Sequence, residues 1–560
     1  VEGRGMNFNR RFFVGGAALA GAAASGPAVA KSGDRKPLAA LRDYMERHRA
    51  EWGIPGMTAT LVGRDGFEGI VHSGWADIDR RVPVGPQHLF QIGSITKMMT
   101  ALAAWSLIEE GKLSPDARLK DVLKGVSVAG GESITLRDLL NHTSGLPADS
   151  AIFPDGGLKS GFKPGTRWTY SNSGYLLAGM MAEAASGVPY PELVETRVLK
   201  KLGMNDSVGA LRVADRSRYA TGYEPALTDR LNPRPAPMTP TPWVDSDSPA
   251  GCVASTAADM AKFLRFLLGL AGGKGGAVLS DETAKRFLAE PADAPGWAPS
   301  VRYGNGVARV EIDGRKYLHH TGGMVSFCSA LHVDAEAGVA AFASANIHYS
   351  LNYRPRDITV YACGLLRALS EGLAAPAPRA PRLVLENPQR FAGVFTAADG
   401  DKFEIAAGEK KISLRRKGRE TAMQEAAPGL FACLDPDLAI TGIVIETEGE
   451  GAAAKAVRAW AGEKEFLASG RTNYQPPAPA ELRALAGRYD NDDRWAGPLY
   501  VYARSGKIWI GNAEPLTKLP NGEWRPGEEW SPERFRFDGF INGRPQRLLF
   551  SGVPFVRRFS

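Results

Sequence analysis

The fold is decided by the stretch Ser94-Ile95-Thr96-Lys97 and by the apolar run that follows it, Met98-Met99-Thr100-Ala101-Leu102-Ala103-Ala104-Trp105-Ser106-Leu107-Ile108. A run of this length predicts a helix that is buried on almost every side, and Gly111 is a typical residue just beyond the end of a helix. Residues i and i+3 share a helix face, so the Lys97 side chain can reach the Ser94 hydroxyl. The stretch therefore predicts a serine paired with a lysine at the N-terminus of a buried helix.

A serine and a lysine in this arrangement can act as a nucleophile and its base. Burial lowers the pKa of a lysine because it disfavours the charged form, as a base near neutral pH requires. The helix N-terminus adds backbone N–H groups and the positive end of the helix dipole, and both favour an alkoxide or an oxyanion. A second S-x-x-K, Ser160-Gly161-Phe162-Lys163, lies among glycines and is followed by proline, so it is interpreted as a loop.

Tyr170-Ser171-Asn172 precedes a second apolar helical segment, so we expect it on a turn above a cleft. A phenol near a lysine ammonium can ionise more readily than its reference pKa of about 10 indicates, and it can then pass on the serine proton. The Asn172 amide can both donate to and accept from a peptide-like substrate. The structural alternative is a tyrosine and an asparagine that only satisfy a turn, but the upstream Ser94 and Lys97 favour the functional interpretation. Tyr303-Gly304-Asn305 is a second Y-x-N, and its context sets it apart.

His320-Thr321-Gly322-Gly323 lies between two strand-like segments, residues 315–318 and 326–333. The two glycines let a substrate backbone approach the edge of a strand and pair with it, as in β-augmentation. The backbone N–H groups of Gly323 and Ser94 can then form an oxyanion hole. A glycine bulge between two core strands is the structural alternative.

Three further stretches complete a resemblance to a known family: Leu139–Leu146, Pro249–Thr256 and the helix from Thr256 through Phe263. Together with the motifs above they resemble the class C β-lactamase and D-aminopeptidase superfamily of S12 serine peptidases, which also includes family VIII esterases. The resemblance covers about residues 36 to 370. It implies a β-lactamase/DD-peptidase-like α/β (α+β) catalytic domain with an antiparallel sheet and a helical subdomain.

The resemblance also implies a role for each motif residue. Ser94 would be the acyl-enzyme nucleophile, and Lys97 and Tyr170 the proton-transfer pair. The backbone N–H groups of Ser94 and Gly323 would form the oxyanion hole. The substrate-binding residues would be Asn172, His320, Thr321 and Gly322.

One departure from the family pattern bears on specificity. Most β-lactamases and DD-carboxypeptidases of the superfamily have Lys-Thr-Gly where this chain has His320-Thr321-Gly322. A histidine with a reference pKa of about 6.5 is mostly neutral at pH 7, so the anchor for a substrate carboxylate is weakened. D-aminopeptidases and some esterases resemble this chain in having histidine here, which favours a peptidase or esterase over a dedicated β-lactamase.

The composition excludes several other functions. With 560 residues and 44% hydrophobic content, the chain is long enough for more than one domain. A formal net charge of +7 is mild and indicates neither a nucleic-acid nor a membrane partner. The eight histidines form no H-E-x-x-H pattern, so no metal and no cofactor are expected. The cysteines lie among apolar or small residues and favour free buried thiols; they are Cys252, Cys328, Cys363 and Cys433.

The first 30 residues resemble a twin-arginine export signal after a short tag scar. Arg10-Arg11 leads into an Ala/Gly-rich apolar stretch that ends at Ala28-Val29-Ala30, a small-residue cleavage pattern. The apolar stretch is too short to span a bilayer, so no stable membrane insertion is expected. The pattern predicts export, with the bacterial periplasm as the location.

The amino-acid pattern of the chain changes after the predicted catalytic domain. Two Pro/Ala-rich linkers separate segments of short alternating apolar runs, and both segments open with a Gly-x-aromatic pattern, Gly393-Val394-Phe395 and Gly487-Arg488-Tyr489. We interpret them as two copies of a small all-β module, each a barrel that hides its edge strands, as in the layout of D-aminopeptidases. The alternative role is stability or dimerisation, and a homodimer is possible. The predicted ranges are 31–372 (catalytic domain), 373–384 (linker), 385–474 (first module), 475–480 (linker) and 481–560 (second module).

The motifs leave three classes of function open. The first is a serine hydrolase acting on small or D-residue-containing peptides, with a linearised-microcystin-type peptidase as one specific candidate. The second is a family VIII-type carboxylesterase or lactonase, and the third is a weak β-lactamase or a penicillin-binding protein without efficient turnover. Peptide and ester substrates pass through the same tetrahedral intermediate, so the catalytic residues do not separate them.

Overall fold

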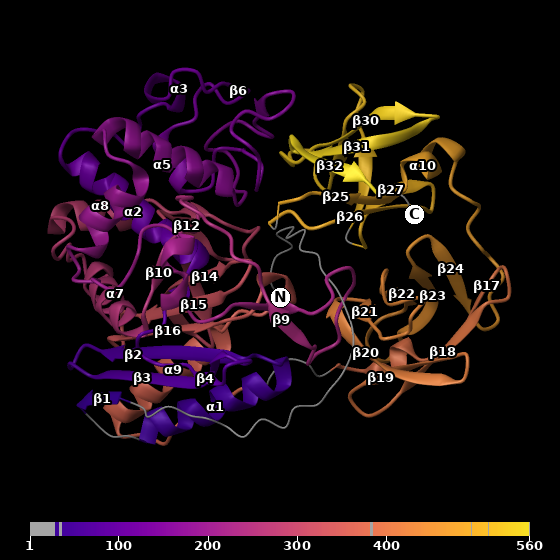
Figure 1. The fold of residues 1–560 in the computed structure, drawn as a ribbon, viewed down its shortest axis with the longest axis horizontal. Helices are drawn as coiled ribbons and strands as arrows, with labels where there is room; N and C mark the ends of the chain where they lie inside the picture. The colour runs from indigo at the N-terminus through magenta and orange to yellow at the C-terminus, as the bar shows by residue number, and fades with distance from the viewer. Residues whose placement is uncertain (1–28, 33–35, 381–384, 494, 513, 559–560) are drawn as a thin grey trace.

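The computed structural model describes residues 29–32, 36–380, 385–493, 495–512 and 514–558. It contains one α/β domain and two closed β-barrels (Figure 1). The multidomain fold class predicted from the sequence is confirmed. Residues 1–28, which carry most of the expected export signal, lie outside the described residues. Within the described residues, no helix is both long and apolar enough to cross a membrane.

An antiparallel sheet of ten strands forms the centre of the α/β domain. Nine strands follow one another in the order β1-β3-β2-β16-β15-β14-β13-β12-β11, and β4 (Val82–Pro83) pairs with β3. The bounds in this order are Val29–Ser32, Glu68–Asp77, Gly56–Gly63, Val339–Ala345, Cys328–Asp334, Arg315–Gly323, Val307–Ile312, Arg302–Gly304 and Ala292–Asp293.

Helices cover both faces of this sheet, and the alternation of side chains along the strands explains how. On β2, Leu61 packs into a core shared with α1 (Lys36–Trp52) and α9 (Arg356–Glu371), whereas the next residue, Val62, packs into the opposite core. The opposite core is built mainly from α2 (Thr96–Glu109), α5 (Asn172–Ser186) and α7 (Ala257–Ala271). The central strands β2 and β16, buried on both faces, therefore carry apolar and small residues throughout.

The remaining elements of the domain are short. The helices are α3 Leu119–Val122, α4 Leu136–Leu140, α6 Tyr190–Val194 and α8 Asp281–Ala289. The two-stranded pairs are β5 Phe90–Gln91 with β10 Ala254–Ser255, β6 Val128–Ala129 with β7 Leu158–Lys159, and β8 Tyr223–Pro225 with β9 Met238–Pro240.

Helix α2 is the central helix predicted from the sequence. Every residue from Thr96 to Ile108 is buried, and the helix ends at a C-cap on Glu110. Gly111 follows with φ +72°, a conformation that glycine adopts without strain. The prediction of a helix buried on every side is confirmed.

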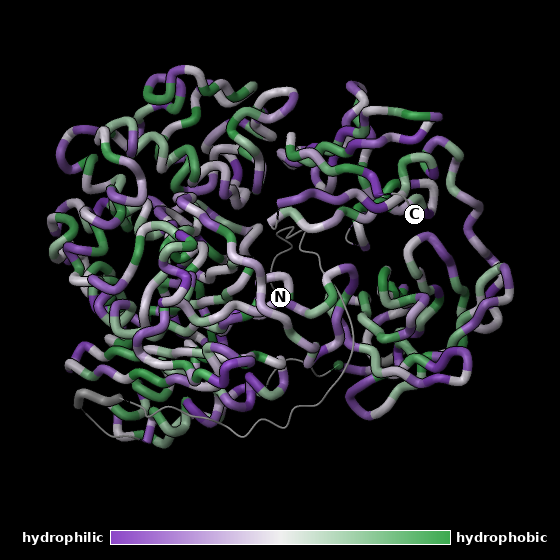
Figure 2. Tube along the Cα trace, viewed as in Figure 1, coloured by the Kyte–Doolittle hydropathy of each residue, from purple (hydrophilic) through white to green (hydrophobic). Residues whose placement is uncertain are grey.

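The two C-terminal barrels confirm the two predicted all-β modules. Both barrels contain hydrophobic and hydrophilic stretches (Figure 2), and buried residues alternate with more exposed ones along strands such as Ile412–Arg416 and Lys507–Ile510. Phe395 and Tyr489, the aromatic residues of the two Gly-x-aromatic patterns, are both fully buried on the first strand of their barrel. Barrel one contains β17 Gly393–Ala397, β18 Lys402–Ala407, β19 Ile412–Arg416, β20 Arg419–Ala427, β21 Leu430–Ala432, β22 Ile443–Glu448, β23 Lys455–Ala461 and β24 Lys464–Ala468. After α10 (Ala480–Leu485), barrel two contains β25 Gly487–Asp490, β26 Leu499–Arg504, β27 Lys507–Ile510, β28 Glu514–Lys518, β29 Trp524–Pro526, β30 Phe535–Ile541, β31 Arg544–Phe550 and β32 Val553–Arg557.

Both barrels contact the α/β domain. The Arg234 backbone N–H donates to Gln424 Oε1 of barrel one at 2.6 Å. The Tyr349 hydroxyl donates to the Trp495 carbonyl of barrel two at 2.9 Å. The barrels are thus attached to the catalytic domain by specific hydrogen bonds. The four cysteines are all buried and free, as predicted.

Candidate active site

The predicted serine and lysine meet where α2 begins. Ser94 lies in a single 3-10 turn, Gly93–Ile95, immediately before the helix. The Lys97 amine donates to Ser94 Oγ at 3.1 Å, to Asn172 Oδ1 at 2.7 Å and to the Ala250 carbonyl at 2.8 Å. Lys97 is fully buried, whereas Ser94 is partly exposed. The hydroxyl is therefore accessible from outside while the amine is held behind it.

Burial gives Lys97 the character of a base. It lowers the pKa of the amine from 10.5 to about 7, and the negative charge of Asp149 offsets this only in part. A large fraction of Lys97 is therefore neutral at physiological pH. This agrees with the shift expected from the sequence.

Tyr170 lies beside the same pair. The Lys97 amine is 4.9 Å from the centroid of the Tyr170 ring, and the Ser94 hydroxyl hydrogen bonds to the phenol. Burial raises the pKa of Tyr170, and the bond to Ser94 offsets only part of the rise. The expectation of a readily ionised phenol is corrected, because desolvation outweighs the nearby charge. In the free protein Tyr170 is a neutral proton donor or acceptor.

The end of β14 lies against the serine turn. The ladder to β13 ends at the pair Ala308 and His319, so residues 321–323 extend beyond that neighbour. A Cβ on Gly322 would stand 1.9 Å from the Ile92 carbonyl oxygen, and a Cβ on Gly93 would stand 2.7 Å from the Gly323 nitrogen. The glycines thus allow the Gly323 backbone nitrogen to approach the residue before Ser94.

His320 is less available than the sequence suggested. It is 1% exposed; its Nε2 is 2.9 Å from the Tyr303 hydroxyl and its Nδ1 is 2.5 Å from the Thr321 carbonyl. Burial, together with the charge of Lys97, holds its pKa well below the usual value. These contacts agree with the weakened carboxylate anchor expected from the sequence, since both nitrogens already have partners and the cation is disfavoured.

Two groups near the site were not identified from the sequence. Asp149 accepts from Asn172 Nδ2 at 2.9 Å, so the Asn172 amide bridges Lys97 and a carboxylate. Tyr303, from the Y-x-N copy that was set apart, belongs to an aromatic cluster beside the site. Its ring centroid lies 5.5 Å from that of Trp297, whose ring is 6.2 Å from that of Tyr170. The repeated Y-x-N was the available signal for Tyr303, whereas Trp297 stands in a Pro/Ala/Gly loop with no motif.

The second S-x-x-K is confirmed as a loop. Ser160 Oγ donates to the carbonyls of Ser144 and Phe162, and Lys163 is exposed. This serine satisfies local backbone acceptors and has no lysine partner.

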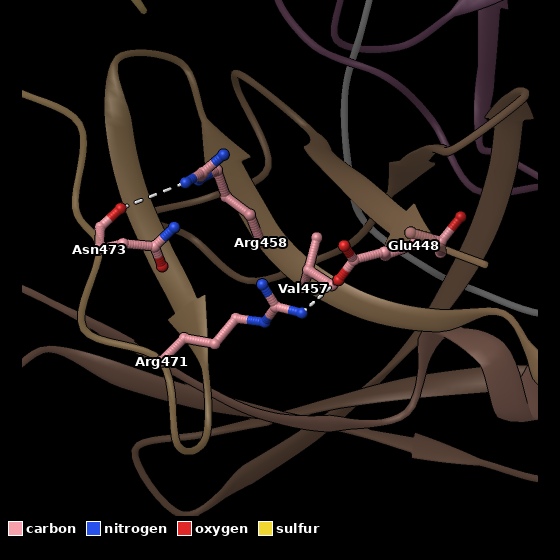
Figure 3. A pocket seen from close by; sticks show the side chains of 6 residues that line it. Glu448, Val457, Arg458, Arg471 and Asn473 are labelled. Carbon is pink, nitrogen blue, oxygen red and sulfur yellow. Dashed lines mark hydrogen bonds and ion pairs between the residues drawn. The ribbon is translucent and has the colours of Figure 1, made fainter.

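A hollow of about 250 Å³ on barrel one is a separate feature (Figure 3). Arg471 pairs with Glu448, and Arg458 donates to the Asn473 carbonyl at 3.3 Å. Its arginines are therefore occupied by groups of the protein.

Among the described residues, no group of three or more His, Cys, Asp and Glu side chains is placed to hold a metal ion.

Comparison with known proteins points to one family. The family model described as Beta-lactamase matches residues 41–366. Penicillin-binding protein 4 of Amycolatopsis lactamdurans is 31% identical over 320 residues, covering 52% of this chain and 81% of that protein. Penicillin-binding protein 4* of Bacillus subtilis is 28% identical over 265 residues, covering 42% of this chain and 56% of that protein.

A solved structure shares the fold beyond the catalytic domain. The octameric penicillin-binding protein homologue from Pyrococcus abyssi has a TM-score of 0.51 at 21% identity, covering 77% of this chain and 99% of that chain. The family model alone spans more than half of the 560 residues. The chain therefore belongs to the beta-lactamase family of serine hydrolases, within the S12-type superfamily that includes the penicillin-binding proteins.

Proposed function

We propose that the chain hydrolyses small or D-residue-containing peptides through an acyl-enzyme on Ser94. The observation that carries the proposal is the fully buried Lys97 amine, 3.1 Å from Ser94 Oγ, with a pKa of about 7. A base poised near the working pH gives general-base catalysis its best balance between protonation state and driving force.

The proposed reaction begins when neutral Lys97 takes the Ser94 proton as Oγ attacks the substrate carbonyl. The backbone N–H groups of Ser94 and Gly323 receive the oxyanion. Tyr170 gives its proton to the leaving group and regains one from the Lys97 ammonium. Water then cleaves the Ser94 ester with the same groups acting in reverse, which restores the free enzyme.

The proposed substrate class follows from the absence of a lysine at position 320. A neutral, engaged His320 replaces the lysine that most β-lactamases of the superfamily use near a carboxylate, which argues against penicillins and peptides with a free terminal carboxylate as preferred substrates. The histidine and the two barrels support a D-aminopeptidase-like activity, with linearised microcystin-type peptides as a specific candidate. Asn172, Thr321 and Gly322 are proposed to bind the substrate along the end of β14.

A carboxylesterase or lactonase is the second candidate. Trp297 and Tyr170 are partly exposed, and Tyr303 packs behind Trp297, so these aromatic side chains give this side of the site a neutral surface suited to apolar esters. A weak β-lactamase or a penicillin-binding protein with slow turnover is the third candidate, supported by the similarity to two penicillin-binding proteins.

One panel of substrates separates the candidates. We expect a purified sample to hydrolyse D-aminoacyl p-nitroanilides faster than L-aminoacyl p-nitroanilides, short-chain p-nitrophenyl esters and a chromogenic cephalosporin. Ser94→Ala should abolish turnover and labelling by a fluorophosphonate, and the matched variant Ser160→Ala should retain both. A probe adduct on Ser94→Ala in intact-mass analysis would contradict the nucleophile, and a clear preference for esters would favour the second candidate.

Export to the periplasm and self-association are proposed as well. Export is supported by the pattern of residues 1–30. Self-association, as a homodimer or a larger assembly, is in keeping with the octameric state of the Pyrococcus homologue. Light scattering on the purified chain measures its self-association directly.

A further inference from the structure

Barrel two reaches the segment 147–150 beside the catalytic residues. Glu533 lies between β29 and β30, and its Oε1 accepts from the Ala148 backbone N–H at 2.7 Å. Ser551, in the turn between β31 and β32, donates from its hydroxyl to the other oxygen of Glu533. The Ser551 carbonyl accepts from Ser150 Oγ at 2.8 Å. Two turns of the barrel thus hold one short segment of the catalytic domain.

The same segment is continuous with the catalytic pair. The Ala148 carbonyl accepts from the Asn172 backbone N–H at 2.7 Å, while the next residue, Asp149, accepts from the Asn172 side chain at 2.9 Å. Asn172 in turn accepts from the Lys97 amine at 2.7 Å, and that amine donates to Ser94 Oγ at 3.1 Å. Ala148 is therefore held on its N–H by barrel two and on its carbonyl by the residue that binds Lys97.

A carboxyl group is a poor choice for simple packing at this position. Glu533 is only 6% exposed, and burial raises its pKa to about 7 although Ser551 and Ala148 donate to it. The charged groups that face it are Asp149, which raises the pKa further, and Arg534, which lowers it. Arg534 Nη1 donates to the carbonyls of Ser531 and Glu533. A buried carboxyl is tolerated when its hydrogen bonds are needed, and here they hold the Ala148 backbone.

We infer that Glu533 is a positioning residue of the hydrolase and that barrel two completes the catalytic centre by fixing the 147–150 segment against Asn172 and Lys97. The inference rests on the proposed function of Lys97 as the base for Ser94. It gives barrel two a role in the reaction beyond stabilising the chain.

The test compares three variants of the full-length chain. Glu533→Ala removes the acceptor for Ala148, Glu533→Gln keeps an acceptor without the charge, and Glu523→Ala is the matched control. Glu523 also belongs to barrel two and contacts the catalytic domain, through Lys159 at 3.0 Å, but the Lys159 contact is not part of the chain of bonds that leads to Asn172. The rate of fluorophosphonate labelling of Ser94 is measured from pH 5.5 to 9, with thermal unfolding as a check on the fold.

We expect Glu533→Ala to slow labelling about tenfold or more, because a displacement of about 1 Å in a reacting group can cost far more than that. Its pH midpoint should rise above that of the parent, since a looser segment admits water to Lys97. Glu533→Gln should stay within about threefold of the parent, and Glu523→Ala within about twofold. Labelling of Glu533→Ala at the parent rate with the parent midpoint would overturn the inference.

Two further measurements keep the outcomes separate. If Glu533→Ala does not fold, Ser551→Ala replaces it by removing the hydroxyl that donates to Glu533; slower labelling supports the inference and an unchanged profile overturns it. Ser94→Ala is run in the same assay. Labelling of that variant would refute the proposed nucleophile itself, whereas an unlabelled Ser94→Ala beside a normal Glu533→Ala refutes only the role of barrel two.

Discussion

At the scale of single residues, the candidate site combines a fully buried lysine with a more exposed serine. Lys97 is fully buried and Ser94 is partly exposed, so desolvation acts on the proposed base while the proposed nucleophile stays accessible. The same desolvation keeps Tyr170 and His320 neutral, because it raises the pKa of the phenol and lowers that of the imidazole. At neutral pH the phenol and the imidazole are therefore uncharged, while Lys97 is divided between its neutral and charged forms.

This contrast predicts the pH dependence of acylation. Because the pKa of Lys97 is lowered to about 7, kcat/KM should be low at pH 5.5, rise through about pH 7 and level off at higher pH. Lys97→Arg should lose about 10²-fold or more, since a guanidinium does not deprotonate in this range. Lys163→Arg, in the exposed second S-x-x-K, is the control and should match the parent. Activity of Lys97→Arg within a few-fold of the parent would mean that residue 97 supplies charge and not a base.

At the scale of elements, the site depends on how closely β14 lies on the serine turn. Ser329 of the neighbouring strand donates to the Ile92 carbonyl at 2.7 Å, and the same carbonyl leaves no room for a side chain at position 322. The strands and the turn are thus fixed to each other by a side-chain hydrogen bond and by the close approach of their backbones. A shift of β14 would move the Gly323 nitrogen away from Ser94.

Gly322→Ala tests this contact. Its Cβ would be 1.9 Å from the Ile92 oxygen, so β14 must move, and we expect kcat/KM to fall about tenfold or more with a loss of about 1–3 kcal/mol in stability. Gly269→Ala in α7 is the control, because its nearest neighbour would be 3.7 Å away. That variant should keep full activity and gain a little stability from the better helix propensity of alanine. Parent-like kinetics for Gly322→Ala would show that the strand end is free to adjust. Enzyme kinetics and thermal unfolding on both variants make the comparison.

The elements themselves could be predicted from the sequence, whereas several of their contacts could not. The start of α2, the turn before α5 and the glycine end of β14 follow from local periodicity and glycine placement, and each is where the sequence indicated. Asp149 and Tyr303 reach the site through strand order and loop packing, which no local pattern encodes. The raised pKa of Tyr170 was missed for a related reason, since a neighbouring charge is visible in a motif but burial is a property of the folded domain.

At the scale of the whole molecule, the two barrels were predicted from composition and repeated patterns, but their relation to the active site was not. The interface between barrel two and the catalytic domain contains two glutamates in opposite electrostatic states. Burial raises the pKa of Glu533 from 4.5 to about 7. Burial alone would also raise that of Glu523, but hydrogen bonds from Asn521 and Lys159 lower it overall. The two ends of one interface should therefore respond to pH in opposite directions.

This opposition predicts how stability varies with pH. A carboxyl whose pKa is higher in the folded state stabilises the fold below its unfolded pKa, and that contribution is lost as pH rises through the folded pKa. For Glu533 the loss falls between about pH 4.5 and 7 and amounts to about 3 kcal/mol. The parent should therefore lose stability relative to Glu533→Gln as pH rises through this range. The parent should gain stability relative to Glu523→Gln as pH rises, because a lowered pKa contributes stability that is lost as pH falls. Thermal unfolding of the three proteins from pH 4.5 to 8 provides the measurement, and parallel curves for parent and Glu533→Gln would show that this carboxyl does not titrate within the interface.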